Sequence, residues 1–158
     1  MRIQNFMAAL FLITAVSNVA LADAGHSHGG ETAYGVPGDP KKPARIVNVT
    51  MRETEDGKML FSPNQISVKK GEQVRFMLRN NGQLDHEVVI ATLEENLKHA
   101  EQMRKNPDME HDDPNAKRLA PKQTGEIVWR FTKAGTFDFS CLIPGHRESG
   151  MSGSIQVN

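Results

Sequence analysis

Three side chains that can bind soft metal ions lie close together near the C-terminus. Cys141 is the only cysteine of the 158-residue chain, His146 follows five positions later, and Met151 follows five after that. A lone cysteine or methionine is usually a buried apolar residue. However, Pro144-Gly145 directly precedes His146 and indicates a tight turn rather than a packed helix or strand. We therefore expect a thiol, an imidazole and a thioether on one short loop.

This donor set favours copper over other metals. Thiolate and thioether ligands select copper, and a trigonal site of two histidines and one cysteine with a weak axial methionine is typical of a blue-copper centre. Zinc sites do not use methionine, and an iron–sulfur cluster requires several cysteines. The loop offers one histidine only, so the hypothesis requires a second from elsewhere, and His86 is the candidate.

The whole chain is short enough for one domain and is electrically balanced. It contains 19 Lys+Arg and 19 Asp+Glu, so it has no basic excess for binding nucleic acid. Residues 1–22 resemble a secretory signal, with Arg2, an apolar stretch over 6–16 and the small-residue pattern at 20–22. The apolar stretch is short for a membrane anchor. We expect signal cleavage, export to the periplasm and no membrane span afterwards.

Residues 23–44 are rich in Gly, Ala, His and Pro, and they predict a flexible arm. The arm contains His26 and His28. Histidine-rich tracts bind metal, but a solvated tail without a role explains the pair equally well.

Most of the remaining chain alternates apolar and polar residues, which is typical of strands. Val74, Phe76 and Leu78 share one face of one such segment. The strand-like segments are residues 45–51, 59–61, 65–68, 73–79, 87–91, 124–132, 136–141 and 154–157. Short strands separated by turns predict an all-β fold, a β-sandwich.

Residues 92–123 interrupt this pattern and predict a helical insertion. Thr92 and Glu95 form a capping box at its start, and Asn106-Pro107 predicts the end of the helix. An acidic loop follows. A second metal site could be formed by His99, Met103, Met109 and His111, although a helix face and a solvated loop explain these residues better.

Taken together, these motifs resemble those of the cupredoxin family, over residues 45–158. The resemblance rests on Phe61-x-Pro63, on Asp85-His86, and on the segment Gly135-x-Phe137-x-Phe139-x-Cys141-x-x-Pro144-Gly145-His146-x₄-Met151. The last loop is similar to that of rusticyanin and auracyanin. With its arm and insertion, the chain also resembles small exported cupredoxins linked to copper tolerance.

The resemblance implies a Greek-key β-sandwich that holds one type 1 copper at one end. His86, Cys141 and His146 would be the equatorial ligands and Met151 the axial ligand. Many members carry Asn or Ser beside the first histidine, where this chain has Asp85 and Glu87. This difference leaves the hydrogen bond to the cysteine sulfur open. We also expect an apolar collar of Leu142, Ile143 and Pro144 around His146.

Two functions follow from this reading, and a third is disfavoured. The first is a periplasmic protein of copper tolerance that binds copper and exchanges one electron, with a copper-handling or redox protein as partner. The alternative is a soluble electron carrier between respiratory partners. An enzyme would need further copper centres or an open coordination position, so we do not expect catalysis.

Overall fold

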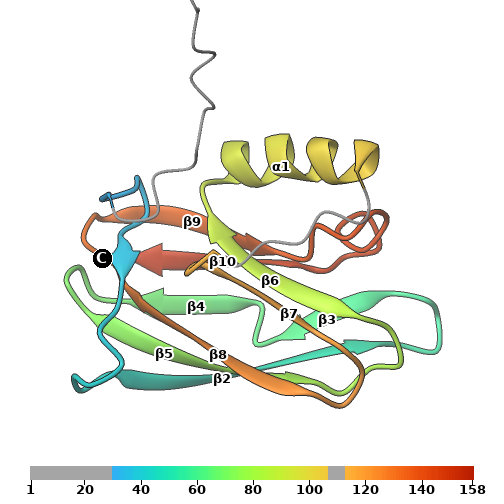
Figure 1. Cartoon of the computed structure of the whole chain (residues 1–158), viewed down its shortest axis with the longest axis horizontal. Helices are drawn as coiled ribbons and strands as arrows, with labels where there is room; N and C mark the ends of the chain where they lie inside the picture. Colours follow the sequence, from blue (N-terminus) through green and yellow to red (C-terminus); the bar gives the residue numbers. More distant parts are fainter. Residues whose placement is uncertain (1–29, 107–112) are drawn as a thin grey trace, which may run out of the picture.

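The computed structural model describes residues 30–106 and 113–158. These residues form ten strands and one helix, labelled in chain order in Figure 1. The strands are β1 (Val36–Pro37), β2 (Arg45–Glu53), β3 (Met59–Ser62), β4 (Gln65–Val68), β5 (Gln73–Asn80), β6 (His86–Ala91), β7 (Ala116–Leu119), β8 (Thr124–Arg130), β9 (Gly135–Ser140) and β10 (Ser152–Val157), and the helix is α1 (Leu93–Lys105).

The strands form two five-stranded sheets that pack face to face. One sheet has the order β1-β8-β5-β2-β3 and the other β4-β10-β9-β6-β7. Figure 1 shows β2, β5 and β8 in the lower layer and β6, β9 and β10 in the upper layer. The chain passes repeatedly from one sheet to the other, which confirms the predicted Greek-key sandwich.

The core lies between the sheets because alternate strand residues point inward. Val74, Phe76 and Leu78 of β5 are buried, as the alternation predicts. Ile127 and Trp129 of β8 are buried with them, and both belong to the same cluster of core residues. This packed interior gives the strand ends fixed positions.

Helix α1 covers the outer face of the upper sheet. Its capping box is present, because Thr92 Oγ1 accepts the Glu95 N–H at 3.2 Å and the Glu95 carboxylate accepts the Thr92 N–H at 3.0 Å. Ala100 and Met103 pack on Val89 and Leu142 in a second small core. All six residues of β6 are therefore buried.

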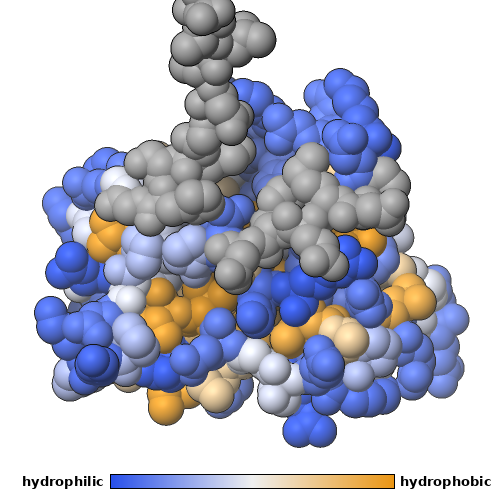
Figure 2. Space-filling model, viewed as in Figure 1, coloured by the Kyte–Doolittle hydropathy of each residue, from blue (hydrophilic) through white to orange (hydrophobic). Residues whose placement is uncertain are grey.

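The surface of α1 that faces away from the sheet is mostly hydrophilic in the view of Figure 2. In residues 30–106 and 113–158, α1 is the single helix, and it is too short and polar to cross a bilayer.

The insertion and the arm differ in part from the sequence-based expectations. Residues 116–119, expected to belong to a loop, form β7, which pairs with β6. The expected flexible arm packs on the domain at Tyr34, whose ring stacks on Trp129 with centroids 5.4 Å apart. β1 pairs with β8. The proposed signal at 1–22 and the histidines His26 and His28 lie outside the described residues.

Candidate metal centre

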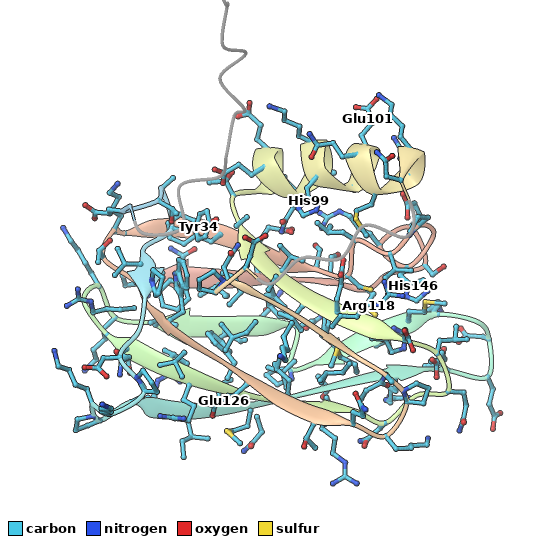
Figure 3. All side chains as sticks on the ribbon, in the orientation of Figure 1. Tyr34, His99, Glu101, Arg118, Glu126 and His146 are labelled. Carbon is cyan, nitrogen blue, oxygen red and sulfur yellow. The ribbon has the colours of Figure 1, made fainter. Side chains whose placement is uncertain are left out.

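Three neighbouring strands bring the predicted ligands to one end of the sandwich. His86 is the first residue of β6, Cys141 directly follows β9, and Met151 directly precedes β10. These strands are adjacent in the order β10-β9-β6. Figure 3 shows His146 at the end of the sandwich opposite Tyr34.

The structure places two imidazoles and the thiol around one point. The Nδ1 atoms of His86 and His146 are 3.2 Å apart, and Cys141 Sγ is 3.3 Å from His146 Nδ1. One donor atom from each of the three residues lies within 4.8 Å of the others. His86 and Cys141 are fully buried, while His146 is 9% exposed.

The spacing of these donors fits a small metal ion. Metal bonds of about 2.0–2.3 Å, as zinc makes to the same donor types, would separate neighbouring donors of a trigonal site by about 3.5–3.8 Å. The observed 3.2–3.3 Å is close to this range. A soft sulfur beside two imidazole nitrogens is the donor set that suits copper.

The loop between β9 and β10 is closed by its own backbone. The Cys141 N–H donates to the Met151 carbonyl at 3.1 Å, and the Met151 N–H donates to the His146 carbonyl at 3.1 Å. Gly145 and Gly150 have φ values of 88° and 105°, so they make turns that other residues resist. Met151 is fully buried and belongs to the same core cluster as Cys141.

Glu87 connects the two segments that carry the ligands. Its backbone N–H donates to Cys141 Sγ at 3.5 Å, and its buried carboxyl group accepts the Leu142 N–H at 2.9 Å. Burial raises the pKa of Glu87. The hydrogen bond to the cysteine sulfur, which the sequence left open, is therefore present and comes from the backbone of Glu87.

Glu53, at the end of β2, contacts His86, and the sequence did not predict this contact. Its Oε1 lies 2.8 Å from His86 Nε2. Desolvation opposes ionisation, but hydrogen bonds from the Gln83 and Leu84 N–H groups and from His86 prevail and lower the pKa of Glu53 to about 2. An ionised carboxylate only accepts, so Nε2 carries the proton and Nδ1 keeps its lone pair for a metal.

The two other titrating donors are shifted toward their neutral forms. Burial raises the pKa of the Cys141 thiol to about 12. Burial lowers the pKa of His146. Metal binding must therefore displace a proton from sulfur but need not displace one from His146 at neutral pH.

A largely buried ion pair connects the loop to β9. Arg147 binds Asp138 through two hydrogen bonds of 2.9 and 3.0 Å. The same carboxylate accepts from Ser140 at 2.6 Å and from Asn96 of α1 at 2.7 Å. The helical insertion is thus connected, through Asp138, to the residue next to His146.

The structure supports part of the expected collar and leaves the expected second metal site untested. Leu142 is 1% exposed and packs under α1, so it does not belong to a collar. Ile143 is half-buried and Pro144 is exposed. His99 lies on the underside of α1 (Figure 3) but belongs to no group of three metal donors among the described residues. Met109 and His111 lie outside these residues.

Comparison with known proteins gives a consistent result. Residues 48–158 match the family described as copper binding proteins, plastocyanin/azurin family. The copper-resistant cuproprotein CopI of Rubrivivax gelatinosus is 48% identical, over 96% of this chain and 92% of that protein. The CopI of Pseudomonas aeruginosa is 30% identical, over 98% and 97%. The structure of auracyanin from Roseiflexus castenholzii aligns with a TM-score of 0.60 at 20% identity, over 74% of this chain and 99% of auracyanin.

Proposed function

The chain belongs to the plastocyanin/azurin family of copper-binding proteins, and from this premise we propose that it is an exported protein of copper tolerance. Its copper would be held by His86, Cys141, His146 and Met151. The observation that carries the proposal is the buried cluster in which one thiol faces two imidazole nitrogens. Similarity to two copper-resistant cuproproteins over nearly the whole chain supports the biological role.

A bound copper ion would supply one-electron exchange between Cu(II) and Cu(I). The protein residues keep the donors in place during that exchange. Strand ends and a closed loop fix the donor spacing, and the buried setting excludes water from the sulfur. Four protein ligands would leave no open position for a substrate, so we propose binding and electron exchange rather than catalysis.

We propose export because residues 1–22 have the features of a cleavable signal. Outside the cytoplasm a thiol without a cysteine partner is exposed to oxidation, and a bound metal would protect it. We propose that the domain of residues 45–158 also includes Tyr34, which is buried and stacks on Trp129.

The exposed edge of the site supports one alternative, a soluble electron carrier. His146 is the donor that reaches the surface, and the exposed Leu84 and Pro144 lie in the two segments that carry the histidine ligands. Exposed apolar side chains in these two segments would suit brief contact with a redox partner.

The first test is the visible and paramagnetic spectrum of the purified protein with Cu(II). We expect an intense charge-transfer band from the Cys141 thiolate, which Cys141→Ser should abolish. Wild-type protein as pale as aqueous copper, or a band that survives Cys141→Ser, would refute the site assignment.

The second test is a deletion strain grown with graded copper and complemented with variants. Wild-type protein should restore growth and Cys141→Ser should not, and a form lacking residues 23–29 measures the share of His26 and His28. Normal copper tolerance combined with a respiratory defect would favour the electron carrier instead.

A further inference from the structure

Glu53 reaches the donor cluster from a strand that supplies no ligand. It is the last residue of β2, and its Oε1 is 2.8 Å from Nε2 of His86, 33 positions later. The other ring nitrogen of His86, Nδ1, is the atom that lies 3.2 Å from His146. The imidazole of His86 therefore contacts the donor cluster through Nδ1 and the Glu53 carboxylate through Nε2.

The carboxylate is held in a seat made by the turn before β6. It accepts the Gln83 N–H at 3.0 Å and the Leu84 N–H at 3.0 Å. A Cβ atom at Gly82 would lie 2.5 Å from both carboxylate oxygens, so a side chain there would displace them. These contacts hold the carboxylate in place independently of His86. The backbone of the turn therefore helps to direct Glu53 Oε1 toward Nε2 of His86.

We infer that Glu53 is a positioning residue that tunes the copper site, favouring Cu(II) over Cu(I) through its hydrogen bond to His86. This inference rests on the proposed copper site. A carboxylate on the far nitrogen fixes the ring and makes the ligating nitrogen more basic. A nearby negative charge also stabilises a doubly charged ion more than a singly charged one. Both effects lower the reduction potential.

The test replaces Glu53 with glutamine, which keeps the shape and an acceptor oxygen but removes the charge. Loss of such a partner typically weakens metal affinity about 10–100-fold. If the loss falls on Cu(II) alone, the potential rises by about 60–120 mV, at 59 mV per tenfold for one electron. The measurements are voltammetry and separate competition titrations with Cu(I) and Cu(II) chelators.

Glu72→Gln is a matched control at the opposite end of β2. Glu72 also accepts a backbone N–H, from Lys69, and binds Arg45, the first residue of β2. Its side chain is 23% exposed and that of Glu53 is 22% exposed. Glu72→Gln should leave the potential unchanged.

Gly82→Ala provides a second route to the same result. It keeps the charge of Glu53 but pushes the carboxylate from its seat, so it should raise the potential in the same direction. It replaces the first variant if Glu53→Gln does not fold.

The outcomes separate this inference from the proposed function. A wild-type protein without a thiolate–copper band would overturn both. A normal band with an unchanged potential in Glu53→Gln, or equal losses of Cu(I) and Cu(II) affinity, would overturn this inference alone.

Discussion

The two histidines of the donor cluster have the same chemistry but are held in different ways. His86 is fully buried at a strand end, and its far nitrogen meets the carboxylate of Glu53. His146 is 9% exposed on a loop, and its neighbour Arg147 binds Asp138. The strand half of the site, at His86, is closed to solvent, whereas the loop half reaches the surface at His146. We therefore propose that His86 sets the properties of the site and that His146 is its contact with the outside.

The largest effect should come from removing the buried histidine. His86→Ala and His146→Ala should both lose the intense visible band, because each removes an equatorial ligand. Only His86→Ala should also destabilise the metal-free fold strongly, by about 2–4 kcal/mol, since it leaves a buried cavity and removes one hydrogen-bond partner of the Glu53 carboxylate. Urea unfolding of the metal-free proteins measures the difference, and equal losses would contradict the division into two halves.

The next effect concerns the ion pair behind the loop. Asp138 and Arg147 side chains are 11% and 17% exposed. Asp138→Asn should cost about 2–3 kcal/mol, somewhat less than the 3–5 of breaking a fully buried pair, because Arg147 loses its partner charge. Thermal unfolding measures this cost.

An exposed pair between α1 and the same loop is the control. Arg104 and Glu148 are 3.8 Å apart, with side chains 56% and 59% exposed. Arg104→Gln should change stability by less than about 0.5 kcal/mol. If it costs as much as Asp138→Asn, the helix rather than the buried pair supports the loop.

A smaller effect is expected at the proposed axial ligand. Met151→Leu nearly conserves volume and should cost less than about 1.5 kcal/mol. It should leave copper bound and raise the reduction potential, since the axial ligand tunes it. Voltammetry and the visible spectrum test this, and a potential and colour identical to wild type would show that Met151 is not a ligand.

The sequence predicted the loop half of the site better than the strand half. Cys141, His146 and Met151 lie within eleven consecutive residues, so their spacing alone predicted that they share one loop. Glu53 contacts His86 across 33 positions, and only the folded turn before β6 aims it at the ring. No local pattern distinguishes Glu53 from the other acidic residues near it.

Local sequence patterns also predicted most of the fold, but two parts of it were missed. Alternation over residues 73–79 and 124–132 revealed buried faces directly. β7 was missed because its sequence, Ala-Lys-Arg-Leu, buries one residue only and depends on backbone pairing with β6. The packing of Tyr34 was missed because a lone aromatic in a Gly- and Pro-rich stretch carries no periodicity.

Tyr34, at the end of the sandwich opposite the proposed copper site, supplies the last prediction, an effect on stability at high pH. Burial raises the pKa of Tyr34 from 10.0 to about 12, and burial raises that of Cys141 from 9.0 to about 12. Because each folded pKa exceeds its ordinary value, the stabilising contribution is complete below pH 9–10 and is lost as the pH rises toward 12.

In the metal-free protein both groups contribute to this alkaline loss. In the copper-loaded protein Cys141 would already be a thiolate ligand, so only the Tyr34 contribution would remain. Tyr34→Phe should cost about 1 kcal/mol at neutral pH, for the bond between Asn115 and the hydroxyl group. It should also flatten the decline above pH 10 in both forms. Unfolding curves at pH 8 to 11 measure how steeply stability falls with pH. Identical slopes for the copper-loaded and the metal-free wild type would show that Cys141 does not contribute to the alkaline loss of stability.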